Sequence, residues 1–424
     1  MLLSRSLIRA IATFACTIAT VAIGEDRFNV LYKFTGGSDG QHPEAGLTAI
    51  GSTLYGTTAA MHTGDPGQGT IFSINSDGSS FQTLHTFTGA EGINPQASLT
   101  AIGSTLYGTT AGPYAGQPDL SQGTIYSISV DGTNFNLLYS FPYGGNRPYP
   151  SSGLALIGPS LYGTVNQAPD DNSVGAVYSI KPDGSQFQII SDFIGEQKGS
   201  GMLQGGVTPN GSLIYGAITH GGAYDQGLVY SMNPDGTNVE ILHDFAGSYP
   251  PAGISTDGAN PTTDLTIIGS QIFGTTAYGG HGYVGTWFSM NLDGTNYSVL
   301  HSFTGDDDGL LPRSALVEYG ARLYGTTAYG LYSVNLDGTG FRVEHYFYSP
   351  DGNSTLPSGN LLLIGDTLYG VTDDGDAVGD YGTIYSLRVP ETSSISLAAV
   401  GISLFISIAA WRRVHSNSKS GELG

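Results

Sequence analysis

This 424-residue chain contains two groups of acidic residues whose spacing could allow them to bind a metal ion. One group is Asp306, Asp307 and Asp308, and the other is Asp373, Asp374, Asp376 and Asp380. Glycine-containing acidic loops can bind Ca²⁺, which takes about six to eight oxygen ligands. Neither group has the alternating spacing of an EF-hand loop, and solvated carboxylates in Asp-Gly turns would explain both. Calcium is therefore a hypothesis here, and no other cofactor is expected.

Tyrosine is the second residue type in this sequence that suits a binding site. The chain has 26 tyrosines, several of them in segments that connect apolar runs. Tyrosine combines a large apolar ring with a hydroxyl group, which suits stacking on sugars or contact with another protein. The candidates for a binding face are Tyr114, Tyr149, Tyr224, Tyr278, Tyr283 and Tyr329.

Catalytic motifs are absent from the sequence. It contains no His-Glu-x-x-His and no phosphate-binding loop, and its Gly-x-Ser-x-Gly match at 36–40 lies between two predicted strands, whereas a nucleophile elbow joins a strand to a helix. A glycosidase needs two carboxyl groups about 5–9.5 Å apart, and the sequence alone brings no pair together. No catalytic residue is predicted. A carbohydrate-active enzyme of the glycoside hydrolase or lyase type, using loop carboxylates, stays as an alternative to a binding protein, as does a purely structural matrix protein.

Histidines recur at one repeat position, at His85, His243, His301 and His345. Residues at one position of a repeat are spread around the molecule rather than brought together, so a hydrogen-bonded structural role is favoured over a metal site. The loop histidines His62, His220 and His281 have no second ligand beside them in the sequence. They are not predicted to bind metal.

The charge balance narrows the choice of partners. There are 14 Lys and Arg against 35 Asp and Glu, which gives a formal net charge of −21. A surface this acidic repels phosphate backbones, so nucleic-acid binding is excluded. The single cysteine, Cys16, lies in the N-terminal leader, so the mature chain should contain no disulfide. Lipid attachment at Cys16 is a less favoured alternative, because the residues before it fit that motif poorly.

Residues 1–24 have the three parts of a secretory signal peptide. Arg5 and Arg9 provide the positive start, an apolar stretch follows, and Ala22-Ile23-Gly24 is a small-x-small cleavage site. Cleavage before Glu25 and export are expected. A buried N-terminal helix is the alternative.

An uncharged segment, residues 395–411, lies near the other end and is followed at once by Arg412 and Arg413. As a helix it would span about 26 Å, just short of the ~30 Å hydrocarbon core of a bilayer. The positive-inside rule places the basic tail, 412–424, in the cytoplasm and the rest of the mature chain outside. The sequence thus predicts a C-terminal transmembrane helix that anchors the chain at the cell surface.

The six residues in front of this helix, 389–394, begin with Val389, Pro390 and Glu391. A Pro-Glu motif, an apolar span and the pair Arg412-Arg413 together resemble the PEP-CTERM sorting signal, which exosortases process in Gram-negative bacteria. The usual motif is Val-Pro-Glu-Pro, and Thr392 replaces its last proline here. The resemblance implies an exosortase-like partner and leaves open whether the tail is cut or retained.

The region 25–388 consists of seven repeats. Each opens with a run bounded by aromatic or β-branched residues, starting at Phe28, Phe81, Phe135, Phe187, Val239, Tyr297 and Phe341. A short apolar run, a Leu-Tyr-Gly-Thr-Thr segment and a Gly-Thr-Ile-Phe-Ser-Ile segment follow, which makes four strand signals in each repeat. This pattern predicts an all-β protein, a seven-bladed β-propeller of four-stranded blades. A β-solenoid is the alternative, although its coils are usually shorter.

An Asp-Gly pair follows the last strand of six repeats and predicts a tight hairpin to the strand that opens the next repeat. The seventh repeat has no such pair, and the run from Phe28 to Phe34 has no earlier partner. We therefore expect the N-terminal strand to complete the last blade, with Phe28, Val30, Tyr32 and Phe34 alternating onto one buried face. The glycine of each Tyr-Gly-Thr segment should allow close backbone approach near the axis.

These motifs, with Asp-Gly-Thr and Leu-His-Ser-Phe-Thr-Gly, resemble the bacterial choice-of-anchor tandem repeats, also called GloVer repeats, over nearly all of residues 27–388. Members of that family carry one of several surface anchors, which agrees with the C-terminal tail, and the family implies no reaction. Tight and long connections alternate along each repeat, so all the long ones should gather on one face. We expect that face to bind extracellular polysaccharide or a neighbouring surface protein.

Overall fold

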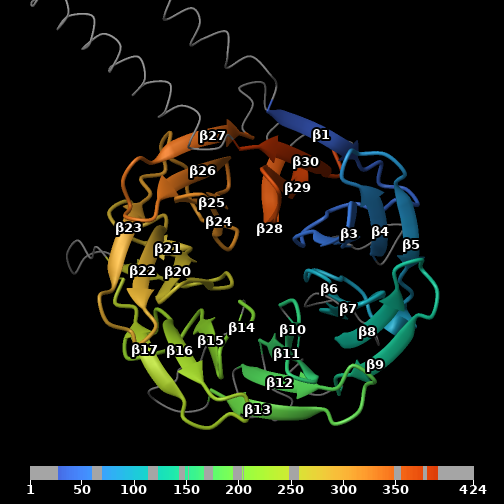
Figure 1. Cartoon of the computed structure of the whole chain (residues 1–424), viewed down its shortest axis with the longest axis horizontal. Coiled ribbons are helices and arrows are strands. Elements are labelled where there is room, and N and C mark those ends of the chain that lie inside the picture. The colour runs from blue at the N-terminus through green and yellow to red at the C-terminus, as the bar shows by residue number, and fades with distance from the viewer. Residues whose placement is uncertain are drawn as a thin grey trace, which may run out of the picture.

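Seven four-stranded antiparallel sheets are arranged in a ring around a central axis (Figure 1). The computed structural model describes residues 27–59, 69–112, 123–142, 149–150, 152–166, 175–193, 203, 205–247, 257–347, 355–375 and 380–389. Each of these sheets is one blade, with one edge strand near the axis and the other edge strand on the rim. The predicted seven-bladed β-propeller is confirmed.

The strands follow one order in each blade, from the axis outward. Blades 1 to 4 comprise β2 (Thr48–Ile50), β3 (Thr53–Thr58), β4 (Thr70–Asn75) and β5 (Gln82–Thr86); β6 (Thr100–Ile102), β7 (Thr105–Thr110), β8 (Thr124–Ser129) and β9 (Asn136–Ser140); β10 (Ala155–Ile157), β11 (Ser160–Val165), β12 (Ala176–Ile180) and β13 (Gln188–Asp192); β14 (Thr208–Asn210), β15 (Leu213–Ile218), β16 (Leu228–Met232) and β17 (Glu240–Asp244). Blades 5 to 7 comprise β19 (Thr266–Ile268), β20 (Gln271–Thr276), β22 (Thr286–Asn291) and β23 (Ser298–Ser302); β24 (Val317–Tyr319), β25 (Arg322–Thr326), β26 (Gly330–Asn335) and β27 (Arg342–Tyr346); β28 (Thr355–Ile364), β29 (Thr367–Gly375), β30 (Thr383–Arg388) and β1 (Phe28–Lys33). A two-stranded ribbon pairs β18 (Gly258–Ala259) with β21 (Tyr278–Gly279), and a short 3₁₀ helix, η1, covers Gly89–Glu91.

The N-terminal strand closes the ring, as the sequence predicts. β1 pairs antiparallel with β30, from Phe28 opposite Leu387 to Lys33 opposite Thr383. Figure 1 shows these two strands, at opposite ends of the colour scale, side by side on the rim. Blade 7 is therefore built from both ends of the repeat region.

The prediction that Val30 faces the core is wrong. The register of β1 against β30 shifts between Val30 and Tyr32, which is a β-bulge, and the other six rim strands have the same shift. A bulge adds one residue and so reverses the alternation of side chains beyond it. As a result Val30 is 44% exposed, whereas Leu31 packs against the core between blades 7 and 1.

The hydrophobic core is divided among the seven junctions between neighbouring blades. At the junction of blades 2 and 3, for example, Tyr107 and Ile125 pack with Leu161 and Tyr178. Six similar clusters fill the other junctions. Burial of apolar surface thus stabilises the contacts between blades, and no blade has a core of its own.

The glycine of the Tyr-Gly-Thr strands has a different role from the one predicted. Gly56 lies directly opposite Phe72 on the neighbouring strand, and a Cβ at Gly56 would lie 2.5 Å from the end of the Phe72 ring and 2.9 Å from a methyl of Leu47. A phenylalanine or tyrosine lies opposite this glycine in all seven blades. In six blades this aromatic ring fills the space, and in blade 6 it is filled by Leu316 and by Trp287 of blade 5, so side chains rather than another backbone occupy the position.

Stacked rings join the blades along the rim. A ring on one rim strand lies nearly parallel to a ring at the start of the next at six junctions: Tyr32 on Phe81, His85 on Phe135, Tyr139 on Phe187, His243 on Tyr297, His301 on Phe341 and His345 on Phe28, with centroids 3.7–4.2 Å apart. Carboxylates accept hydrogen bonds from three of these histidines: Glu91 from His85, Asp257 from His243 and Asp308 from His301. The repeated histidines therefore have the structural role that their spacing predicts.

The two faces of the disc differ in their connections. Because the strands of a blade are antiparallel and sequential, the turns after the first and third strands share one face, and the longer connections after the second and fourth share the other. We call these the tight-turn face and the long-loop face. Within the described residues, no helix has the length and apolar character needed to cross a membrane, and the predicted helix at 395–411 lies outside them.

Candidate functional site

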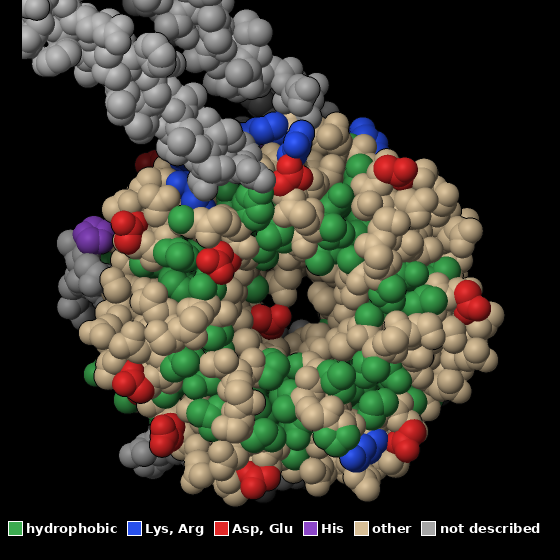
Figure 2. Space-filling view, viewed as in Figure 1, with side chains coloured by type: hydrophobic (Ala, Val, Ile, Leu, Met, Phe, Trp, Pro, Cys, Tyr) green, Lys and Arg blue, Asp and Glu red, His purple; other side chains and the backbone are tan. Residues whose placement is uncertain are grey.

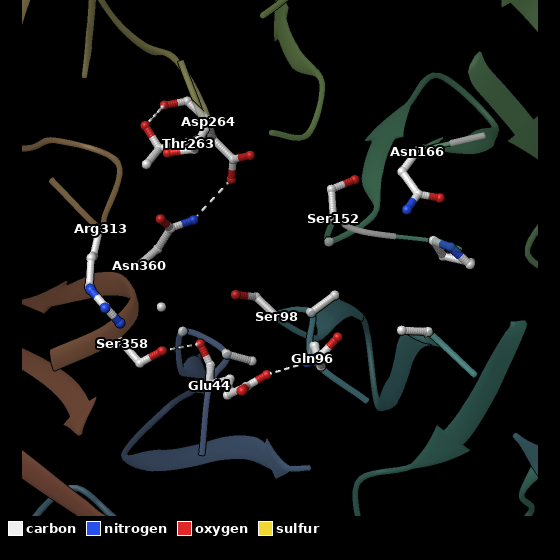
Figure 3. Close-up of a pocket in the computed structure, with 18 of the residues that line it drawn as sticks. Glu44, Gln96, Ser98, Ser152, Asn166, Thr263, Asp264, Arg313, Ser358 and Asn360 are labelled. Carbon is white, nitrogen blue, oxygen red and sulfur yellow. Dashed lines mark hydrogen bonds between the residues drawn. The ribbon is translucent and has the colours of Figure 1, made fainter. Parts of the chain in front are cut away.

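A cavity of about 690 Å³ lies on the axis at the long-loop face. Its wall is formed by residues that precede the first strand of a blade or lie within it, and by residues just after the second strand, contributed by six of the seven blades. Figure 3 shows Glu44, Gln96, Ser152, Asp264 and Asn360 around it. The volume falls within the range of ~300–1,000 Å³ that is typical of small-molecule sites.

A sequence signal for this cavity exists and was missed. Six repeats contain Pro-x-x-x-Leu before the first strand, beginning at Pro43, Pro95, Pro150, Pro261, Pro312 and Pro357. Each leucine is buried near its blade junction, and in all six repeats at least one described residue between the proline and the leucine lines the cavity. Those positions vary in type, and together they place Glu44, Gln96, Asp264 and Arg313 in the cavity wall.

Glu44 is the cavity residue with the most altered acidity. Burial raises the pKa of the Glu44 carboxyl to about 7, and the charge of Asp373 adds to this, while a 2.5 Å hydrogen bond from Gln96 and the charges of His42 and Arg313 oppose it. Oδ1 of Asp373 lies 3.0 Å from Nδ1 of His42, and this pair is buried. Near neutral pH the Glu44 carboxyl is therefore present in both its protonated and its ionised form.

Glu44→Gln should flatten the pH dependence of stability. Glu44 has a higher pKa in the folded chain than its ordinary value of 4.5, so its contribution to folding is fully present below pH 4.5 and is lost as pH rises through about 7. The free energy of unfolding of the native chain should therefore fall by about 2 kcal/mol more between pH 5 and pH 8 than that of Glu44→Gln. Chemical denaturation of both proteins at several pH values measures the difference. Parallel profiles would show that Glu44 is already ionised at pH 5.

Asp264 and Asn360 form a network that links four blades at the axis. Oδ1 of Asp264 accepts a hydrogen bond from the N–H of Gly206 at 2.5 Å, and Oδ2 accepts one from Nδ2 of Asn360 at 2.9 Å. The side-chain oxygen of Asn360 accepts a further bond from the N–H of Ala315 at 2.8 Å. These residues belong to blades 4, 5, 6 and 7, so the network fixes the shape of this side of the cavity.

The predicted binding tyrosines occupy three kinds of position. Tyr149 lines the axial cavity, and its N–H donates to Oδ1 of Asn166. Tyr224, Tyr278 and Tyr329 are on the long-loop face of blades 4, 5 and 6, with exposed fractions of 61%, 49% and 37%. Tyr283 is half-buried on the same face, and Tyr114 lies outside the described residues. We call Tyr224, Tyr278 and Tyr329 the tyrosine sector.

Three of the predicted carboxylates have hydrogen-bond partners within the described residues, whereas Asp306 and Asp307 are exposed and accept hydrogen bonds there only through their backbone carbonyls. Asp308 accepts hydrogen bonds from His301 and from the N–H and hydroxyl of Thr304, which holds the rim loop. Asp373 pairs with His42, and Asp380 accepts from the N–H of Gly382. The side chain of Asp374 and all of Asp376 lie outside the described residues. In the part of the chain that the structure describes, no three acidic or histidine side chains converge on one point.

The sorting motif can be placed only at its first residue. Val389 is fully buried between blades 6 and 7, and its N–H donates to the carbonyl of Asp366 in a tight turn. Pro390, Glu391, Arg412 and Arg413 lie outside the described residues. The described ends of the chain, Arg27 and Val389, are therefore both at the tight-turn face of blade 7.

The surface carries its charge in a dispersed form. Figure 2 shows single acidic side chains spaced around the disc, with hydrophobic patches between the rim and the central opening. The Lys and Arg side chains visible in this view lie mostly at the top of the disc.

Comparison with known families decides where these repeats belong. The family model of the Gloeobacter/Verrucomicrobia repeat matches residues 12–174 and again residues 157–331. The chain belongs to the Gloeobacter/Verrucomicrobia repeat family. The resemblance of the repeats is thereby confirmed. No curated protein matches this repeat protein in sequence.

Solved structures share the architecture of the Gloeobacter/Verrucomicrobia repeat protein at low sequence identity. The extracellular domain of a one-component system from B. thetaiotaomicron matches with a TM-score of 0.54 and 14% identity, over 86% of this chain and 40% of that chain. A europium-containing methanol dehydrogenase matches with a TM-score of 0.53 and 10% identity, over 86% and 93%. The AfRom2 CNH domain matches with a TM-score of 0.52 and 9% identity, over 86% and 100%. These likenesses show the fold alone.

Proposed function

We propose that the protein is exported, held at the cell surface by its C-terminal segment, and binds extracellular polysaccharide through its long-loop face. One observation carries the proposal: the tyrosine sector is on the long-loop face, whereas Arg27 and Val389, where the described chain begins and ends, are on the opposite face. A tether leaving Val389 would direct the tyrosines away from the membrane.

The chemistry of the long-loop face supports a saccharide ligand. Exposed tyrosine rings offer flat apolar surfaces for the C–H faces of sugars, and their hydroxyls can bond sugar hydroxyls. Three such rings on consecutive blades could contact successive parts of one chain. The rigid ring of blades would hold them at a fixed spacing, which lowers the entropy lost on binding.

Replacing the tyrosine sector should remove polysaccharide binding without unfolding the protein. We expect the full chain to bind at least one of cellulose, dextran and mannan, and Tyr224→Ala/Tyr278→Ala/Tyr329→Ala to bind that polymer at least about tenfold more weakly. Leu137→Ala is the control, because Leu137 is 45% exposed near the tight-turn end of the rim strand β9 in blade 2, away from the sector. Equal binding by all three proteins, or no binding to any polymer, would contradict the proposal.

A glycoside hydrolase is the second candidate function, and one observation favours it. Burial gives Glu44 a pKa of about 7 within the cavity, and a carboxyl group that stays protonated near neutral pH can serve as a general acid. Asp264 is the other carboxylate of the cavity wall. Release of reducing ends from the bound polymer, lost in Glu44→Gln, would support hydrolysis; binding without release would support the binding function.

A further inference from the structure

We propose that the axial cavity is a second site, which takes a short neutral oligosaccharide. The inference deepens the proposed function, from which it takes saccharide as the ligand class. The cavity opens on the long-loop face, as do the connections that carry the tyrosine sector, but its wall contains none of the three tyrosines of that sector. The two sites can therefore be tested separately.

The polar groups of the wall are suited to hydroxyl groups. Amides, hydroxyls and carboxylates alternate around the cavity, and Figure 3 shows Gln96, Ser98, Ser152, Asn166, Thr263 and Asn360 among them. Amide and hydroxyl side chains both donate and accept hydrogen bonds, which is what a ligand rich in hydroxyl groups requires. Ala97, Ala277 and Leu311 supply apolar surface between these polar groups.

The charges of the wall favour a neutral ligand. Arg313 is exposed at the cavity and has neither a hydrogen bond nor an ion pair from its guanidinium group within the described residues. Asp264 and Glu44 have the opposite sign, so a strongly anionic or cationic ligand would be repelled by part of the same wall. An uncharged ligand can instead accept a charge-assisted hydrogen bond from Arg313 and donate to the carboxylates.

The wall is also held in place before a ligand arrives. Asp264 and Asn360 are fixed by their bonds to Gly206 and Ala315. Gln96 donates to Glu44, and the hydroxyl of Ser358 donates to the carbonyl of Glu44. A preorganised site loses less conformational entropy on binding.

Calorimetric titration of the full chain with cellotriose, mannotriose and trigalacturonate tests the inference. We expect at least one neutral trisaccharide to bind, and to bind at least about tenfold more weakly to Arg313→Ala and to Ala277→Trp, which would fill the cavity. The matched controls are Arg342→Ala, at an exposed arginine on β27, and Ala321→Trp, at an exposed tight turn on the opposite face. Both should bind like the native chain.

Three outcomes would overturn the inference. One is unchanged trisaccharide binding in Arg313→Ala, which stays decisive if Ala277→Trp does not fold. Another is tighter binding of trigalacturonate than of either neutral trisaccharide. The third is polymer binding that depends on the tyrosine sector while neither neutral trisaccharide binds, which rejects the cavity site and leaves the proposed function standing. Loss of both kinds of binding would reject the two together.

Discussion

A chain that lacks residues 25–34 should lose its cooperative thermal transition or melt at a sharply lower temperature. β1 supplies all the hydrogen bonds to the rim side of β30, and Phe28, Leu31, Tyr32 and Phe34 pack into the junctions on both sides of blade 7. Without this strand the ring has an open edge, and two of its seven junctions lose apolar contacts. Thermal unfolding followed by circular dichroism measures the effect.

A graded version of this experiment uses single residues of the closing segment. Phe34 is 4% exposed and packs against Phe72, so Phe34→Ala should lower the free energy of unfolding by about 3–5 kcal/mol. Val30→Ala is the control on the same strand, because Val30 is largely exposed, and it should cost less than about 0.5 kcal/mol. If the deletion and Phe34→Ala both melted like the native chain, closure by β1 would not stabilise the propeller.

Asp264→Ala should lower the free energy of unfolding by about 2–3 kcal/mol. The substitution removes the acceptor for the N–H of Gly206 and for the amide of Asn360, and both donors are held at the axis by neighbouring blades. A donor that loses its partner away from bulk water costs more than the bond contributed. Urea denaturation at pH 7 measures the change.

Asp264→Asn distinguishes the hydrogen bonds from the volume of the side chain. Asparagine has the same shape but only one oxygen, so it can keep one of the two bonds, and its loss of stability should be roughly half that of Asp264→Ala. Equal losses in both variants would mean that the carboxylate charge matters rather than the network. Native stability in both would show that blades 4 to 7 do not depend on this contact.

The repeat pattern was enough to predict the architecture. Strand signals, Asp-Gly turns and the missing seventh turn are local, and strand formation and turn geometry depend mainly on neighbouring residues. Closure of the ring was predicted by counting strands. The first strand has no earlier partner and the last repeat lacks its fourth strand, so pairing these two completes every blade. The separation of tight and long connections onto two faces followed from the same antiparallel order.

Details that depend on packing were predicted less well. The rim bulge exposes Val30 because the register of β1 is set by its pairing with β30, at the other end of the repeat region. Alternation of residue types within one strand cannot reveal that register. The glycines opposite aromatic rings were assigned to the wrong neighbour for a similar reason. Their space is filled by side chains, which in six blades include the ring on the adjacent strand.

The sequence by itself determined the number of blades, their strand order and the strand that closes the ring. Only the tertiary structure decided which residues meet at the axis. Glu44, Gln96, Asp264 and Arg313 come from different repeats, and each is an ordinary polar residue next to its own chain neighbours. Their meeting depends on the closed geometry of the ring, because a burial-shifted pKa and a shared cavity exist only when distant repeats are brought together.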